Sequence, residues 1–186
     1  AAAFLFVIPA FFLTRSAEQL IDHDIIEKIG WAAIVSCILG RTWCSLYIGG
    51  LKNRSVIKLG PYSVVRNPLY VFSVVGGIGV GLSSESIFFG LVVGLLVFAV
   101  FQIVIRYEER HLNGKLGADY SQYKARVPRW LPNPLLWRDV RVVEVSPHIV
   151  ARVFLDAMIF ILAIPFFEVL ERLQDAGITP ILMRLP

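Results

Sequence analysis

The sequence has few charged residues, and they are absent from long stretches of the chain. Only 17% of its 186 residues are charged, whereas 56% are hydrophobic, and the mean hydropathy is +0.68. An ordinary soluble domain is roughly 25% charged. Glu85 is the only charge in the segment 69–105, and Arg41 is the only charge in 29–51. This scarcity excludes a disordered chain and argues against a soluble globule.

Cysteine and histidine are also rare, which limits disulfide and metal chemistry. Cys37 and Cys44 lie seven residues apart in one apolar segment. On a helix they would share a face but be separated by about 10 Å along the axis, too far for a disulfide. We therefore expect two buried thiols. The three histidines are scattered and form no metal-ligand spacing with these cysteines, so no metal site is predicted.

The apolar segments predict an all-α, polytopic membrane protein with about five transmembrane helices in one membrane-embedded domain, residues 1–186. A bilayer-spanning helix needs about 20 mainly apolar residues. The predicted spans are 1–13, 29–50, 68–82, 86–105 and 149–167. The first is short, so we expect a helix whose beginning precedes this sequence. Only Ser83-Ser84-Glu85 separate the third and fourth spans, which predicts a tight helical hairpin.

Charge in the connecting segments predicts the topology. The segment 51–67 carries four Lys or Arg and no acid, and 106–148 carries eight Lys or Arg and five acids. The positive-inside rule places both segments in the cytoplasm. We therefore interpret the net charge of +4 as membrane topology and contact with anionic lipids, and we expect no nucleic-acid partner.

Polar and small residues inside the apolar segments allow several interpretations. Gly77 and Gly81 have the small-xxx-small spacing of closely packed helices, and the glycine-rich run around them lacks the G-x-G-x-x-G pattern of nucleotide loops. Arg41 lies within a span, where a charge marks either a functional site or a structural polar cluster. Arg152 and Asp156 are four residues apart and are expected to form an ion pair on one helix face.

Two cytoplasmic segments carry the chemistry-bearing residues. Residues 60–70 contain a Gly-Pro turn and then Asn67-Pro68 at the start of a predicted helix, whose N-terminus offers free N–H groups to an anion. An interfacial anchor of tyrosines and arginine explains the same segment equally well. The second segment, 106–110, contains Glu108 and Glu109 at a helix C-terminus, where acids oppose the helix dipole. Either arginines such as Arg66, Arg106 and Arg110 or a ligand must compensate them.

A short helix is expected after this acidic pair. Tyr120 and Tyr123 are three residues apart and would share one face, and Val127-Pro128 would end the helix. Trp130, Leu131 and Trp137 follow in a segment suited to the membrane interface.

These residues, in this order, resemble the isoprenylcysteine carboxyl methyltransferase family and its wider group, which includes phospholipid N-methyltransferases. The similarity covers about residues 45–134. It rests on Gly60-Pro61-Tyr62, Arg66-Asn67-Pro68-Leu69-Tyr70, Glu108-Glu109, Leu116-Gly117 through Arg126-Val127-Pro128, and Pro132. Each piece is weak alone, but the ordered set is specific.

The resemblance implies a membrane-embedded enzyme that uses S-adenosylmethionine, with its active site facing the cytoplasm. The acceptor would be a lipophilic or lipid-linked molecule bearing a carboxylate, amine or thiol. The cofactor-binding residues it implies are Arg54, Ser55, Val56, Ile57, Tyr62, Asn67, Pro68, Leu69, Tyr70, Glu108 and Glu109. A carboxylate suits ribose hydroxyls, and tyrosine rings can face a sulfonium by cation–π attraction.

Three positions depart from the family pattern. Asn67 replaces the family histidine, and Phe72 replaces a usual glycine. The family's acceptor-binding arginine falls at Val104, so Arg106, the nearest arginine, is the candidate catalytic residue. Two other classes stay open: an NADPH-dependent, sterol-reductase-like oxidoreductase, and a non-catalytic membrane scaffold. The paired acids argue against the first, because cofactor phosphates would require more basic residues.

Overall fold

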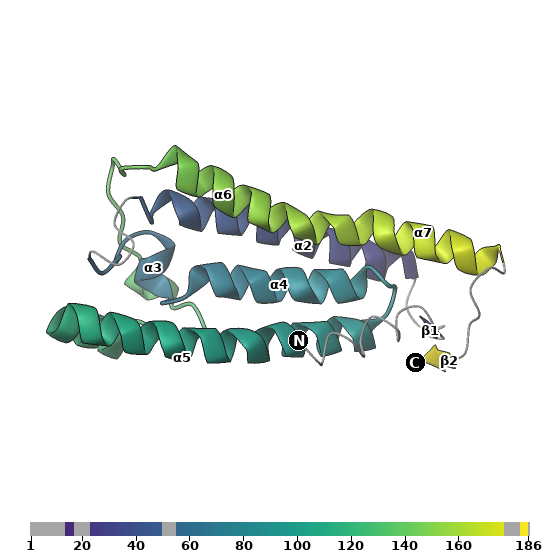
Figure 1. The fold of residues 1–186 in the computed structure, drawn as a ribbon, viewed down its shortest axis with the longest axis horizontal. Coiled ribbons are helices and arrows are strands. Elements are labelled where there is room, and N and C mark those ends of the chain that lie inside the picture. Colours follow the sequence, from purple (N-terminus) through teal and green to yellow (C-terminus); the bar gives the residue numbers. More distant parts are fainter. Residues whose placement is uncertain (1–13, 17–22, 50–54, 177–182, 186) are drawn as a thin grey trace. The chain divides into compact units, whose positions relative to one another are not determined.

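The computed structural model describes residues 14–16, 23–49, 55–176 and 183–185 (Figure 1). Its elements are β1 (Thr14–Ser16), α2 (His23–Leu46), α3 (Pro61–Val64), α4 (Pro68–Leu82), α5 (Ile87–Arg126), the 3-10 helix η1 (Pro134–Leu136), α6 (Pro147–Met158), the 3-10 helix η2 (Ile159–Leu162), α7 (Ala163–Asp175) and β2 (Met183–Leu185). The three-residue strands β1 and β2 pair in parallel. The predicted helical fold class is confirmed for the chain that the structure describes, and the predicted span 1–13 lies outside it.

Among the described residues, three helical runs are long and apolar enough to cross a membrane: Asp24–Leu46, Ile87–Arg126 and Pro147–Gln174. Helix α4 is apolar but has 15 residues, which corresponds to a rise of about 22 Å. Helix α5 does not end near residue 105, where the apolar run stops; no proline interrupts 106–116, and the helix accommodates Gly114 and continues to the non-helical Gly117. The change at 105 is therefore one of polarity and not of secondary structure.

The helices divide into two compact units, each described by itself. The first unit contains residues 74–97 together with the described parts of 1–36 and 158–186. Within it, α4 and α5 form the predicted hairpin (Figure 1). A side chain at Gly77 would collide with Val97, and one at Gly81 would collide with the backbone of Phe89 and Gly90. These contacts confirm that the small residues serve close helix packing.

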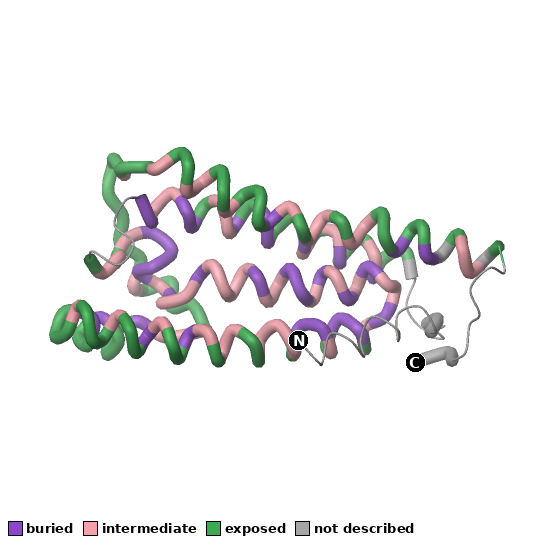
Figure 2. Tube along the Cα trace, viewed as in Figure 1, coloured by how far each residue is buried: buried purple, intermediate pink, exposed green. Residues whose placement is uncertain are grey.

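The first unit has a small core and exposed apolar faces. Phe89, Val93, Phe167 and Leu170 form one buried cluster. Buried and intermediate positions are interspersed along α4 and none is exposed, whereas other helices carry many exposed positions (Figure 2). The exposed apolar residues of this unit include Phe88, Leu91 and Leu95 on α5 and Ile159, Leu162 and Val169 on η2 and α7. Such faces are typical of helices surrounded by lipid.

The second unit contains residues 98–157 and the described part of 37–73. Gly117 interrupts α5 with φ 53° and ψ −123°, a conformation that favours glycine. The Oγ atom of Ser121 donates to Asn113 Oδ1 at 2.9 Å, so the chain after the kink folds back along the end of the first helical segment. Tyr120 and Tyr123 are buried with Val127, which confirms the predicted helix and its shared tyrosine face.

The predictions made for the cysteines and charged residues of the apolar segments can be compared with the structure one by one. Cys37 and Cys44 are buried thiols that form no disulfide, as expected. Arg41 donates from Nη1 to Ser73 Oγ, which favours the interpretation as a structural polar cluster. The predicted pairing of Arg152 with Asp156 is wrong in this structure: both side chains are exposed, and no salt bridge joins them in the described chain.

Candidate functional site

The site begins with a tight turn before α3. Gly60 has φ 54° and ψ −132°, and the Tyr62 N–H donates to the Leu59 carbonyl at 3.2 Å. This is the geometry of a type II′ turn, in which glycine is favoured at the first central position. Pro61 then starts α3, and Pro61 and Tyr62 are buried. The Gly-Pro pair thus presents Tyr62 to the interior of the second unit.

Residues 128–146, which we call the strap, hold this turn in place through backbone hydrogen bonds. The bonds are Gly60 N–H to Arg138 O (2.7 Å), Arg66 N–H to Pro128 O (2.9 Å), Asn133 N–H to Val64 O (2.9 Å) and Arg138 N–H to Ser63 Oγ (3.0 Å). From α5, the Tyr123 hydroxyl donates to the Tyr62 carbonyl at 2.8 Å. The position of Tyr62 is therefore fixed from two directions.

A cavity of about 400 Å³ lies within the second unit. This volume falls within the usual range for small-molecule sites, about 300–1,000 Å³. Nine of the residues that the sequence predicts for cofactor binding line it: Ser55, Val56, Ile57, Tyr62, Asn67, Pro68, Leu69, Tyr70 and Glu108. Arg54 lies outside the described residues. The structure thus brings most of the predicted set into one site.

Two polar groups in the cavity wall lack strong partners. Glu108 is half-buried, forms no ion pair with any described residue, and interacts with the nearby Tyr70 hydroxyl. The Tyr62 hydroxyl is buried and has no hydrogen-bond partner in the part of the chain that the structure describes. Burial raises the pKa of Tyr62 well above its ordinary value, so the hydroxyl stays protonated and can donate. An unpaired buried hydroxyl in the same wall as a carboxylate without an ion-pair partner is suited to a hydroxyl-bearing ligand.

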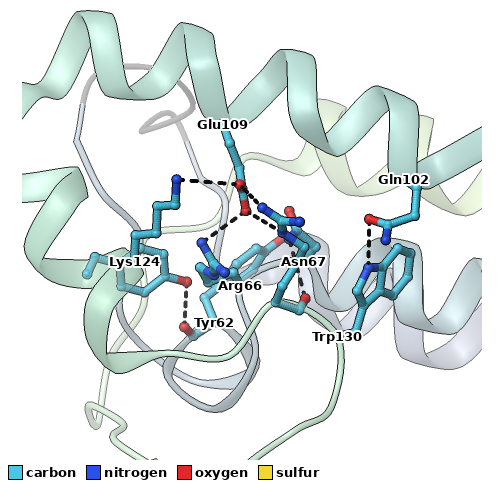
Figure 3. A network of polar contacts seen from close by, with 9 residues as sticks. Tyr62, Arg66, Asn67, Gln102, Glu109, Lys124 and Trp130 are labelled. Atoms are coloured by element: carbon cyan, nitrogen blue, oxygen red, sulfur yellow. Dashed lines mark hydrogen bonds and ion pairs between the residues drawn. The ribbon is translucent and has the colours of Figure 1, made fainter.

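The second glutamate of the pair, Glu109, reaches a group of basic side chains that includes Arg66 and Lys124 (Figure 3). Glu109 is not among the residues that line the cavity, and only 6% of its side chain is exposed. Its carboxylate accepts two hydrogen bonds from Arg129, at 2.6 and 3.1 Å, and lies 3.0 Å from Arg66 Nη1. Lys124 Nζ is 4.0 Å away. These hydrogen bonds raise the pKa of Arg129, which keeps it charged.

The three arginines expected to compensate the acids have different positions. Arg66 pairs with Glu109 as predicted and also lines the cavity. Arg106 and Arg110 are exposed and make no salt bridge with the acids in the described chain. Arg110 lies over the Tyr107 ring at 4.7 Å. Arg106, the candidate catalytic residue, does not line the cavity.

Several lining residues were missed from the sequence. They are Ile48, Arg66, Tyr107, His111, Leu112, Leu116, Tyr120 and Tyr123. Leu112 and Leu116 follow Glu108 at steps of four, so helical periodicity was a usable signal for them. No local signal identified Arg129, which follows Glu109 by 20 residues and reaches it only because the chain folds back at Gly117.

Asn67, which replaces the family histidine, keeps a polar contact. Its side-chain amide donates to the Arg129 carbonyl at 3.4 Å (Figure 3). Asn67 also accepts backbone hydrogen bonds from Tyr70 and Val71 through its carbonyl, as the residue before the first turn of α4 does. An uncharged residue at this position therefore maintains both the helix start and its link to the strap.

The apolar helices and the cavity define a helical membrane protein with a cavity of the size that small molecules occupy. The phospholipid methyltransferase family matches residues 32–119, a range that contains α3, α4 and Glu108. The chain belongs to this family.

Two relatives are similar over most of their length. Over 150 residues the chain is 31% identical to the cobalt-zinc-cadmium resistance protein CzcN of Cupriavidus metallidurans, a match that covers 81% of this chain and 69% of that protein. Over 158 residues it is 30% identical to the nickel-cobalt-cadmium resistance protein NccN of Alcaligenes xylosoxydans xylosoxydans, covering 85% and 74%. No solved structure matches the chain.

Proposed function

We propose that this protein transfers the methyl group of S-adenosylmethionine to a lipophilic acceptor at the cytoplasmic surface of a membrane. Membership of the phospholipid methyltransferase family supports a membrane methyltransferase. The observation that carries the proposal is the cavity that combines the Glu108 carboxylate, which has no ion-pair partner among the described residues, with the unpaired hydroxyl of Tyr62. Both groups suit the hydroxyls of a nucleoside.

The residues present fit this cofactor. The Glu108 carboxylate would accept hydrogen bonds from ribose hydroxyls, and Tyr62 would donate one. Val56, Leu112 and Leu116 offer an apolar surface for the adenine ring. At the start of α4, Pro68 has no N–H and the N–H groups of Tyr70 and Val71 donate to the Asn67 carbonyl, so the Leu69 N–H and the positive end of the helix dipole would face the cofactor carboxylate. The ribose hydroxyls and the carboxylate of S-adenosylmethionine thus each have a counterpart in the wall.

When bound, S-adenosylmethionine supplies a methyl group on a positively charged sulfonium. The tyrosine rings of the wall would face that cation through their π-systems, and Glu108 would add a negative charge. Methyl transfer depends chiefly on aligning the acceptor with the methyl carbon and sulfur, so the contribution of the chain is to position both molecules and to exclude water. No group of three His, Cys, Asp or Glu residues in the described chain is arranged to hold a metal ion.

The cavity lies where α5 changes from an apolar to a polar surface. Val100 and Ile103 are exposed apolar residues of α5, whereas Arg106 and Arg110 are exposed one and two turns later. Tyr107 and Glu108 enter the cavity wall at this boundary. A polar cofactor from the cytoplasm and an acceptor from the lipid would therefore meet at one level, where aromatic and basic residues favour the membrane interface.

The names of the two relatives concern resistance to cobalt, zinc, cadmium and nickel. We propose that, in such a resistance system, this chain would methylate a lipophilic molecule. Binding of metal by the chain itself is not part of this proposal.

Calorimetric binding of S-adenosylhomocysteine to the detergent-purified protein tests the proposal. We expect micromolar affinity, lost in Glu108→Gln, and no binding of NADPH. Transfer of labelled methyl from S-adenosylmethionine to membrane lipids would then identify the acceptor. Binding of NADPH alone would favour a reductase, and binding of neither molecule by the folded protein would favour a scaffold.

A further inference from the structure

The strap exposes large apolar side chains although it is an ordered part of the second unit. Leu135 is 94% exposed, Val142 83% and Leu131 81%. Leu135 is nevertheless held in η1, where its N–H donates to the Asn133 side chain at 3.1 Å. Exposed leucines on a backbone fixed by hydrogen bonds indicate a surface that another apolar phase covers.

The strap is tied to the ends of two candidate membrane spans. Trp137 stacks on Trp43 of α2, with ring centroids 5.9 Å apart and an interplanar angle of 16°. Tyr47, just after α2, donates to Asp139 at 3.0 Å. At its other end the strap leads directly into α6, which opens the span 147–174. Since both attachments lie at span ends, the strap lies at the level of the bilayer boundary.

We infer that the strap is an interfacial anchor that inserts Leu131, Leu135 and Val142 into the lipid at the membrane surface. The exposed apolar side chains would enter the boundary between headgroups and acyl chains, and Trp137 would lie among the headgroups. The exposed Arg138 and Arg141 are placed to contact lipid phosphates; of the two exposed acids, Asp139 accepts the Tyr47 hydrogen bond and Glu144 would face water.

This anchor has a consequence for the cavity. The strap holds α3 through the bonds of Gly60, Ser63 and Val64, and α3 carries Tyr62. Insertion of the strap would therefore hold α3 at the membrane surface, and with it the part of the cavity wall that Tyr62 forms. The inference itself does not depend on methyl transfer, because it concerns only where the strap lies.

Single-cysteine labelling of the full chain in nanodiscs tests the inference. Leu135→Cys carries an environment-sensitive fluorophore, and the phosphatidylcholine of the disc is brominated either near the carbonyl end or near the methyl end of its acyl chains. Ala118→Cys, at an exposed position after the α5 kink, is the water-facing control, and Leu91→Cys, on the apolar face of α5, is the lipid-facing control. The parent protein controls for labelling of the buried Cys37 and Cys44.

We expect the probe at position 135 to be quenched at least about twofold more than the probe at 118, as interfacial insertion requires. Quenching should be stronger with bromine near the carbonyl end, whereas the probe at 91 should respond more to bromine near the methyl end. The inference is overturned if the probe at 135 matches the control at 118 with both lipids, which would leave this surface to water or to a protein. Binding of S-adenosylhomocysteine is measured separately, so a failure of the proposed function leaves this result intact.

Discussion

The two adjacent glutamates offer a sharp test, because the structure gives them opposite roles. In Glu109→Gln the shape of the side chain is kept and its negative charge is removed. The change leaves Arg66, whose side chain is only 10% exposed, without a counterion 3.0 Å away. Breaking a buried ion pair from one side typically costs about 3–5 kcal/mol, because the remaining charge stays desolvated.

The other cations around Glu109 add less to this loss. Arg129 is 31% exposed and can recover some hydration, and Gln can still accept one of its hydrogen bonds. Lys124 is 4.0 Å away and half exposed, so its contribution is below about 1 kcal/mol. We therefore expect Glu109→Gln to lower the free energy of unfolding by about 3–5 kcal/mol, dominated by Arg66.

The assay is denaturation of the detergent-solubilised protein, followed by circular dichroism and paired with S-adenosylhomocysteine calorimetry. Glu108→Gln is the matched control: it should change stability by less than about 1 kcal/mol, because Glu108 forms no ion pair with a described residue, yet it should abolish ligand binding. A stability loss for Glu109→Gln no larger than that of Glu108→Gln would refute the assignment of Glu109 to charge compensation.

Four further changes have defined outcomes. Tyr62→Phe should leave stability unchanged, since its hydroxyl has no described partner, but should weaken S-adenosylhomocysteine binding by roughly 2–10-fold in calorimetry; unchanged affinity would remove Tyr62 from the proposed site. Tyr123→Phe should cost about 1–2 kcal/mol in denaturation, because the buried Tyr62 carbonyl loses its 2.8 Å bond, and a neutral result would contradict that contact. In Gly79→Ala the new methyl would meet the Gly30 carbonyl oxygen at 2.7 Å and should cost about 1–3 kcal/mol, so an equally stable variant would disprove the close packing. Finally, because burial raises the pKa of Tyr62 above its ordinary value of 10.0, the unfolded chain loses this proton first, so stability is unaffected by this group below pH 10 and falls as pH rises above 10; a smaller alkaline loss in Tyr62→Phe checks this by pH titration of unfolding.

Much of the architecture could be predicted from local patterns. Long apolar runs indicated membrane helices, and the short Ser83–Glu85 connection indicated the hairpin of α4 and α5. The Gly60-Pro61 pair indicated the turn before α3, because few residues other than glycine tolerate a positive φ there. Periodicity placed Tyr120 and Tyr123 on one face. Each of these inferences uses residues within a few positions of one another.

The continuity of α5 beyond residue 105 and the absence of an ion pair on α6 were not predictable in this way. Polarity changes at residue 105, but the helix continues through Gly114 to the kink at Gly117, so the change of polarity does not mark a helix end. The expected pair of Arg152 and Asp156 requires only a shared helix face, yet the two side chains lie apart at the exposed surface. A four-residue spacing permits an ion pair but does not require one, because exposed pairs gain little energy.

The sequence by itself determined that this is a helical membrane protein, which residues carry its family pattern, and where its turns lie. The tertiary structure alone decided what each member of the Glu108-Glu109 pair does. Neighbouring residues on a helix point about 100° apart, so one carboxylate must face a different environment from the other. The fold-back at Gly117 brings Arg129 to Glu109 and leaves Glu108 to the cavity. Contacts between residues so far apart in the chain depend on how the helices pack, and no local pattern encodes them.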